Sequence, residues 1–126
     1  QLENIENIQS RRKQIWNSYA ESLESWARAL GIQLPYIPDF STNNAHMFYL
    51  ICKDLDQRNR LIQFLKERGI IAVFHYLSLH KSEYYIEKHD GRELPETDRY
   101  SDTLVRLPMF YEINEDKVIE QLIKFE

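Results

Sequence analysis

The chain has 126 residues, of which 43% are hydrophobic and 29% are charged, with only three glycines and four prolines. This length and composition are typical of one folded globular domain and argue against a disordered or fibrous chain. The formal net charge of −4 argues against nonspecific nucleic-acid binding, which depends on a basic surface. No apolar run approaches the roughly 20 residues that span a bilayer, and no signal peptide opens the sequence. We therefore expect a cytoplasmic protein with no nucleic-acid and no membrane partner.

A single long helix is predicted over residues 2–30. Apolar side chains recur there mostly three, four or seven residues apart, and no proline or glycine interrupts the pattern before Gly31. About 29 helical residues span roughly 43 Å, whereas a compact domain of this size is roughly 35 Å across. The helix is therefore expected to overhang its own domain. This favours a C-terminal fragment of a larger protein, with the long helix in 1–31 followed by a small domain over 32–126. A free-standing domain with a frayed or coiled-coil helix is the alternative.

Two apolar segments predict buried strands separated by a helix. Residues 46–52 are apolar on both alternating faces and residues 70–74 are apolar throughout, as expected of strands covered on both faces. Between them, Asp54 or Asp56 can cap a helix, and Gly69 followed by an apolar residue predicts its end. The sequence therefore predicts a strand, helix, strand unit.

Shorter elements are predicted in the C-terminal part. The polar stretch 81–99 is expected to form a short helix followed by a mobile loop. A second short helix is predicted over 96–104 and a brief strand over 105–108. Asn114 is placed to cap a last helix. The whole is predicted to be an α/β (α+β) domain, with helices packed on a sheet of about three strands.

Polar residues follow the second apolar segment abruptly. His75, Tyr76, Ser78 and His80 lie where the predicted strand ends, and loops held by a rigid sheet are common functional sites. His46 could join the two loop histidines around a metal ion, but imidazoles at such spacings more often supply hydrogen bonds. The only cysteine has apolar neighbours, so a buried thiol is expected and a Cys-based metal cage is excluded. We predict no metal site and place the candidate chemistry in this loop.

Four segments together resemble one protein family. They are NAHMFYL at 44–50, FLKERGIIAVFHYLSLH at 64–80, TDRYS at 97–101 and RLPMFY at 106–111. In this order and spacing they resemble the C-terminal domain of the sugar-nucleotide aminotransferases of the DegT/DnrJ/EryC1/StrS family, which are fold type I pyridoxal-phosphate enzymes. The opening helix, with two adjacent arginines, is similar to the interdomain helix of that family.

The resemblance implies what the full-length enzyme would do. It would transfer an amino group from glutamate to the 4-keto carbon of a dTDP-linked 6-deoxyhexose, in the biosynthesis of lipopolysaccharide or enterobacterial common antigen. Pyridoxal 5′-phosphate would be held by a lysine of a larger N-terminal domain. No catalytic residue, bound cofactor or aminotransferase activity is therefore expected of this chain alone. The resemblance also implies a homodimer.

By the same resemblance the small domain would cover the substrate cleft. His75, Tyr76 and His80 would orient sugar hydroxyls or diphosphate oxygens, and the alternative for each histidine is a structural hydrogen bond. Arg106 would bind an anionic group, or else brace the domain interface. Ser78 stands where the family usually has a proline, so a less rigid loop is expected. A rival hypothesis of another class is an independent ligand-sensing or protein-interaction module.

Overall fold

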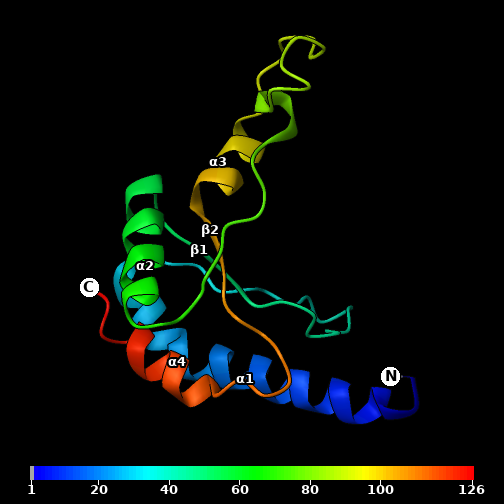
Figure 1. The fold of residues 1–126 in the computed structure, drawn as a ribbon, viewed down its shortest axis with the longest axis vertical. Helices are drawn as coiled ribbons and strands as arrows, with labels where there is room; N and C mark the ends of the chain where they lie inside the picture. Colours follow the sequence, from blue (N-terminus) through cyan, green and yellow to red (C-terminus); the bar gives the residue numbers. More distant parts are fainter. Residues whose placement is uncertain (1) are drawn as a thin grey trace.

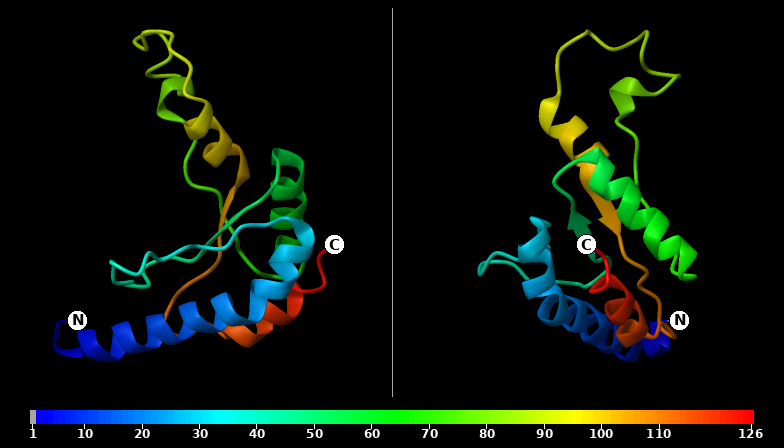
Figure 2. Two further views of the ribbon diagram at one scale, coloured as in Figure 1. Left: turned by 180° about the vertical axis from the view of Figure 1, so that it is seen from behind. Right: turned by 90° about the vertical axis from the view of Figure 1, so that its left-hand side faces the viewer.

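The computed structural model describes residues 2–126, which form a helical body with a projecting arm (Figures 1 and 2). A short 3-10 turn, η1 (Leu2–Asn4), leads into the long helix α1 (Ile5–Leu30), and α4 (Glu115–Leu122) lies beside α1. Helix α2 (Leu55–Glu67) stands across from this pair, with a small sheet nearby. The arm, residues 76–103, carries η2 (Leu79–Lys81) and α3 (Pro95–Thr103). Among the described helices, none is both long and apolar enough to cross a membrane.

The long first helix is confirmed, apart from its first few residues. Gly31 follows it with a left-handed backbone (φ 68°), and the N–H groups of Gly31 and Ile32 donate to carbonyls of the last helical turns. Glycine adopts this conformation without a Cβ penalty, which explains why the helix ends there. The fully or nearly fully buried positions are spaced four apart, at Ile15, Tyr19, Leu23 and Ala27. At the other end Ile5 is 51% exposed, so the first turns of α1 extend past the core.

Two adjacent arginines fix α1 to segments distant in sequence. Arg11 donates from Nη1 to Glu115 Oε1 (2.6 Å) and from Nη2 to Glu115 Oε2 (2.7 Å), and it also donates to two carbonyl groups just before α4. Hydrogen bonding by Arg11 lowers the pKa of the buried Glu115 carboxyl. Arg12 donates to the carbonyl oxygens of Ala45 and His46. Arg11 thereby joins the long helix to the segment before α4, and Arg12 joins it to residues 45 and 46.

The sheet contains two antiparallel strands, fewer than predicted. Strand β1 (Tyr49–Ile51) pairs with β2 (Leu104–Arg106), with Tyr49 opposite Arg106 and Ile51 opposite Leu104. Single bridges extend the sheet, joining Gln33 to Ile51 and Val73 to Arg106. The predicted third strand is therefore reduced to one bridged residue, and β1 is shorter than the apolar run that predicted it.

The prediction that residues 70–74 form a strand covered on both faces was wrong. Ile70 and Ala72 are buried, whereas Ile71 is 77% exposed and Phe74 is 39% exposed. The backbone meets a strand partner only at Val73. An internal strand needs a partner strand on each edge and cover on both faces. This segment is bridged at one residue and buried only at alternate positions, so it does not form the internal strand that its composition predicts. Apolar surface therefore remains exposed just before the candidate loop.

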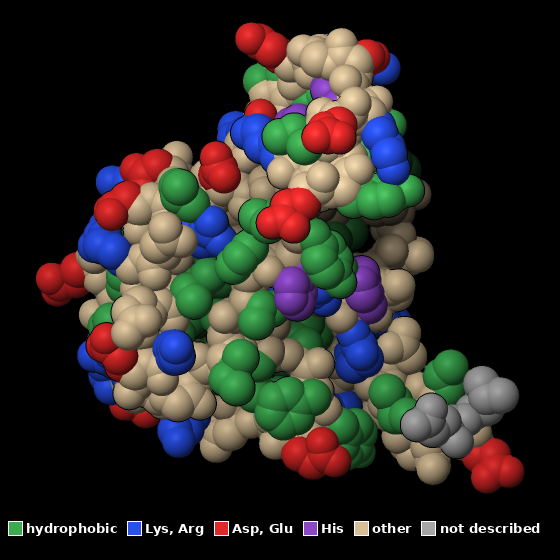
Figure 3. Space-filling view, turned by 45° about the horizontal axis from the view of Figure 1, so that its top comes forward, with side chains coloured by type: hydrophobic (Ala, Val, Ile, Leu, Met, Phe, Trp, Pro, Cys, Tyr) green, Lys and Arg blue, Asp and Glu red, His purple; other side chains and the backbone are tan. Residues whose placement is uncertain are grey.

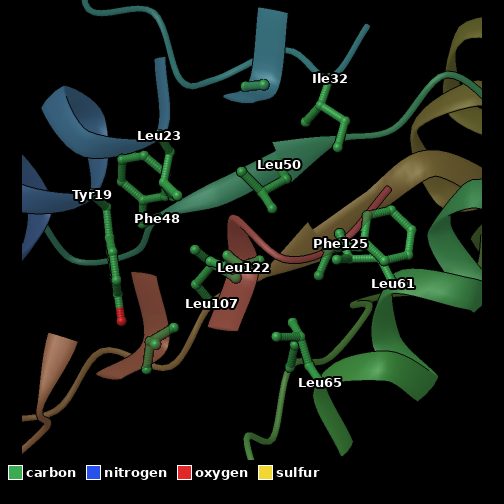
Figure 4. Packing of buried hydrophobic residues seen from close by; sticks show 14 of the residues in the cluster. Tyr19, Leu23, Ile32, Phe48, Leu50, Leu61, Leu65, Leu107, Leu122 and Phe125 are labelled. Carbon is green, nitrogen blue, oxygen red and sulfur yellow. The ribbon is translucent and has the colours of Figure 1, made fainter. Parts of the chain in front are cut away.

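The hydrophobic core joins α1, α2, α4 and both strands (Figure 4). Phe48 packs its ring 5.3 Å from the rings of both Trp16 and Tyr19. The Tyr19 hydroxyl donates to the Pro108 carbonyl oxygen (3.0 Å), so this large side chain is buried without an unpaired polar atom. Cys52 is buried as predicted, and burial raises the pKa of its thiol to about 12. The thiol is therefore unreactive at neutral pH.

The remaining helix boundaries follow the predicted caps closely. Asp54 rather than Asp56 caps α2, accepting a hydrogen bond from the Gln57 N–H (2.8 Å). Gly69 (φ 73°) ends it, because its N–H and the next N–H donate back to the last helical turn. Asn114 caps α4 as predicted, and α3 and β2 lie within a residue or two of their predicted limits. The short helix predicted after residue 81 is instead the 3-10 turn η2 and a run of turns.

Candidate functional site

The candidate loop, residues 73–81, connects the sheet to the arm. At its start, Val73 and Arg106 exchange two backbone hydrogen bonds, from Val73 N to Arg106 O (3.1 Å) and from Arg106 N to Val73 O (2.7 Å). Its last residues, from 76 onward, belong to the arm and end in η2. Residues 74–77 between these points are all exposed. The loop is therefore held at its first residue by β2 and presents its next four side chains to solvent.

Three of the four predicted site residues lie together. The His75 ring stacks on Tyr76, with ring centroids 4.7 Å apart and an interplanar angle of 17°. Arg106 Nη1 lies 3.4 Å from His75 Nδ1. A guanidinium only donates, so this contact is a hydrogen bond when Nδ1 accepts and Nε2 carries the ring proton. Figure 3 shows histidine side chains beside basic and hydrophobic ones where the arm meets the body.

The fourth predicted residue, His80, makes different contacts. Its Nε2 lies 3.0 Å from Asp98 Oδ1 on α3, and its side chain is only 11% exposed. Its ring is 5.3 Å from the ring of His89. Both histidines line a cavity of about 270 Å³ within the arm, together with Tyr85 and Arg92. The contacts of His80 are thus within the arm, whereas His75, Tyr76 and Arg106 contact one another beside β2.

An apolar groove adjoins the stacked pair. It has a volume of about 550 Å³ and is lined by Ile62 and residues 72–77. This volume lies within the range of small-molecule sites, which combine apolar walls with a few polar groups. Here the polar groups are those of His75 and Tyr76. The arrangement can hold the apolar part of a ligand while these side chains and Arg106 hydrogen-bond its polar part.

Sequence reasoning missed Arg58, which lies next to the groove's Phe74. The Arg58 guanidinium stacks over the Phe74 ring (4.3 Å to the centroid), and the residue is only 6% exposed. Its Nε has no hydrogen-bond partner among the described residues. Arg58 lies three residues before Leu61 and seven before Leu65, on the face of α2 that is buried. Helical spacing was therefore the signal that could have found it, although its charge argued for exposure.

Sequence reasoning also did not name Asp98 or Ser101 as individual site residues. Both belong to the TDRYS segment that carried part of the resemblance, and both lie on α3. Asp98 contacts the end of the candidate loop, and Ser101 Oγ donates to the Tyr76 carbonyl oxygen (3.2 Å). Their role depends on how α3 packs against the loop, which no local pattern specifies.

Lysine is the residue type that can hold pyridoxal phosphate covalently. All seven lysines are exposed, at positions 13, 53, 66, 81, 88, 117 and 124. A lysine that carries this cofactor requires an enclosed pocket that excludes water. In residues 2–126 there is likewise no group of three or more His, Cys, Asp or Glu side chains placed to hold a metal ion. We therefore derive no chemical step through a cofactor from these residues.

Comparison with known proteins identifies the family. The model of the DegT/DnrJ/EryC1/StrS aminotransferase family matches residues 1–123, nearly the whole chain. The chain belongs to this family. The resemblance carried by the four sequence segments is thereby confirmed at the level of the family.

Solved structures of aminotransferases share the fold. The chain superposes on the aminotransferase TlmJ from Streptoalloteichus hindustanus with a TM-score of 0.83 and 21% identity, covering 97% of this chain and 32% of that one. For the apo-form of the putative sugar aminotransferase Spr1654 from Streptococcus pneumoniae the TM-score is 0.85 at 21% identity, with 98% and 32% covered. For PseC from Helicobacter pylori, an aminotransferase involved in the biosynthesis of pseudoaminic acid, it is 0.79 at 15% identity, with 99% and 34% covered. The small α/β (α+β) fold is thus confirmed, and the chain spans about a third of the length of these proteins.

Proposed function

We propose that this chain is the small C-terminal domain, with its interdomain helix, of a pyridoxal-phosphate-dependent aminotransferase that acts on a nucleotide sugar. The match of the family model over residues 1–123 is the observation that carries the proposal. Relatives of the same fold are about three times as long. Residues 1–31 are assigned to the interdomain helix and 32–126 to the small domain. The large domain would contain the cofactor lysine, since every lysine of this chain is exposed.

Support for the cofactor comes from the family and from one relative. Spr1654 has been solved in a PLP-form and a PMP-form. When bound, pyridoxal phosphate supplies the electron sink that amino-group transfer requires. In our proposal this chain contributes no atom to that step. Its residues bind and orient the sugar nucleotide and exclude water from the cleft.

The exposed residues of the candidate loop suit a sugar nucleotide. With Nδ1 facing Arg106, His75 keeps its Nε2–H free to donate to a hydroxyl or a phosphate oxygen. The hydroxyl of the exposed Tyr76 can both donate and accept. Arg106 brings a permanent positive charge that suits a diphosphate. The adjoining apolar groove suits the methyl group of a 6-deoxyhexose or the thymine ring.

We infer the substrate more finely from the sequence resemblance. The four segments resemble those of dTDP-4-amino-4,6-dideoxygalactose transaminase, so the proposed keto substrate is a dTDP-4-keto-6-deoxyhexose. Glutamate is the proposed amino donor, and the product would enter lipopolysaccharide or enterobacterial common antigen synthesis. We further propose a cytoplasmic homodimer. The exposed apolar end of α1 supports the dimer. Nothing observed favours the rival hypothesis of an independent ligand-sensing or interaction module.

The test is an amino-transfer assay on the full-length enzyme that contains this chain. Pyridoxal phosphate and glutamate are supplied with dTDP-4-keto-6-deoxyglucose or, in parallel, with a UDP-linked 4-keto sugar. The amino-sugar product is identified by chromatography and mass spectrometry. We expect turnover with the dTDP-linked sugar and at least tenfold lower kcat/KM with the UDP-linked one. Turnover with the UDP sugar alone would contradict the finer substrate, and no turnover with any keto-sugar nucleotide would contradict the proposed function.

A further inference from the structure

One carboxylate oxygen on α3 contacts three side chains from the end of the candidate loop. Asp98 Oδ1 accepts a hydrogen bond from Ser78 Oγ (3.2 Å) and lies 2.8 Å from Lys81 Nζ and 3.0 Å from His80 Nε2. Ser78 is buried, and the His80 side chain is nearly so. The Lys81 ammonium, followed by Ser78 and His80, holds the pKa of Asp98 below its usual range, so the carboxylate is charged at neutral pH.

A second contact from the same helix reaches the exposed part of the loop. Ser101, three residues after Asp98, donates from Oγ to the carbonyl oxygen of Tyr76 (3.2 Å). Residues three apart lie on one face of a helix, so Asp98 and Ser101 present this face to the loop. At the other end, two backbone hydrogen bonds join Val73 to Arg106. The stacked pair of His75 and Tyr76 lies between these two attachments.

We propose that Asp98 is a positioning residue, which holds the loop so that His75 and Tyr76 meet the sugar nucleotide in the correct place. The inference rests on the proposed function. In this account His80 acts through Asp98 and the loop, and it does not touch the substrate. Asp98 itself contacts neither substrate.

The negative charge of Asp98 pairs with the Lys81 ammonium and strengthens the hydrogen bond from Ser78. Hydrogen bonds to an ionised acceptor are roughly twice as strong as neutral ones. An asparagine at this position would keep an acceptor oxygen of the same reach but would leave the Lys81 ammonium without its counter-charge. The loop would then sample positions in which His75 and Tyr76 are displaced, and a displacement of about 1 Å is enough to weaken a positioned contact.

The two half-reactions of the proposed aminotransferase, one with glutamate and one with the keto sugar, distinguish a positioning role from a general loss of structure. Glutamate is small and reacts next to the cofactor, whereas the sugar nucleotide extends to the loop. We expect Asp98→Asn in the full-length enzyme to raise KM for dTDP-4-keto-6-deoxyglucose about tenfold. The rate constant and KM of the half-reaction with glutamate should stay within about twofold of wild type. Asp98→Glu, which keeps the charge, should recover part of the loss.

A matched control lies on the same helix. Glu96 is exposed and pairs only with Arg99 one turn away, so Glu96→Gln removes the same charge from α3 without touching the loop. It should leave both half-reactions at wild-type values. Ser101→Ala removes the second attachment and should raise KM for the keto sugar about threefold, again without an effect on glutamate. This variant decides the question if Asp98→Asn does not fold.

The results distinguish failure of this inference from failure of the proposed function. A wild-type enzyme that does not aminate any keto-sugar nucleotide contradicts the proposed function itself. If wild type is active, equal losses in both half-reactions for Asp98→Asn would show a merely structural role. Wild-type kinetics for the keto sugar in Asp98→Asn, or in Ser101→Ala where the first variant fails to fold, would overturn the positioning role.

Discussion

Arg11 and Glu115 form the ion pair that joins the first and last helices. The two nitrogen–oxygen contacts are 2.6 and 2.7 Å, and the side chains are 21% and 11% exposed. A bidentate pair of this kind, shielded from solvent, is stronger than an exposed pair. This pair holds α1 against the first residue of α4.

Removal of the Glu115 charge should therefore weaken the fold. We expect Glu115→Gln to lower the free energy of unfolding of the 126-residue chain by about 1 to 3 kcal/mol, measured by urea unfolding at pH 7. The matched control is Glu24→Gln, which breaks the exposed pair with Arg28 and should cost at most about 0.5 kcal/mol. Equal, small effects of both substitutions would contradict the assigned role of the pair.

The same pair predicts a dependence of stability on pH. The pKa of Glu115 is lowered in the folded chain by its hydrogen bonds to Arg11, so the unfolded chain binds a proton more readily. The stabilisation is therefore complete above the unfolded pKa of about 4.3 and is lost as the pH falls through the lower, folded value. Urea midpoints measured from pH 6 down to pH 3 should fall less steeply in Glu115→Gln than in wild type. Parallel curves would contradict this linkage.

Arg58 should behave in the opposite way from Arg11. Its buried Nε has no partner among the described residues, and an unsatisfied buried donor costs about 1 to 3 kcal/mol. Its contact with Phe74 returns about 1 kcal/mol. We expect Arg58→Met to leave the unfolding free energy of the chain unchanged or to raise it, whereas Arg11→Met should lower it by about 1.5 to 3 kcal/mol. A comparable loss in both variants would show that Arg58 has a partner.

At the scale of elements, the helices were predictable because their signals are local. Asp54, Asn114, Gly31 and Gly69 each end or begin a helix through contacts within one turn. The apolar segment 70–74 was not predictable in this way. Its composition favours a strand, but only the arrangement of β2 decides how much of it is paired.

In the candidate site, too, one part was predictable from the sequence and another part was not. The sequence pointed to His75, Tyr76 and Arg106 through motif resemblance, and the structure places them in contact. It did not reveal that His80 faces Asp98, because that contact spans 18 residues and depends on the packing of α3 against the loop. Long-range polar pairs of this type follow from tertiary structure, which no local pattern contains.

The first turns of α1 should promote association. The helix has 26 residues and is about 39 Å long, while its buried positions begin only at Ile15. We expect Ile5→Glu with Ile8→Glu to leave the domain folded but more monomeric, because Ile5 is exposed and Ile8 is only partly buried. Light scattering over a concentration series measures this. The control is Ile123→Glu on the far end of the chain, which is also 51% exposed and should not change the mass. A wild-type chain that stays monomeric at high concentration would contradict the proposed association.

At the scale of the whole molecule, the chain spans about a third of the length of the aminotransferases on which it superposes. Its lysines are all exposed, so treatment with pyridoxal phosphate and borohydride should label several of them weakly. Peptide mapping by mass spectrometry checks the distribution. Stoichiometric labelling of one lysine, together with turnover of glutamate and a keto-sugar nucleotide, would contradict the assignment of the cofactor lysine to another domain.

The central claim is that the exposed side chains of the candidate loop, His75 and Tyr76, bind the sugar nucleotide. Its most direct test is His75→Ala in the full-length enzyme, with each half-reaction followed separately. The control is His46→Ala, an exposed histidine whose side chain lies outside the loop. Loss of one hydrogen bond to a polar or charged partner should lower kcat/KM for dTDP-4-keto-6-deoxyglucose about fivefold to 150-fold. The glutamate half-reaction and the control should stay at wild-type values. Unchanged keto-sugar kinetics in His75→Ala, or an equal loss in both half-reactions, would contradict the account.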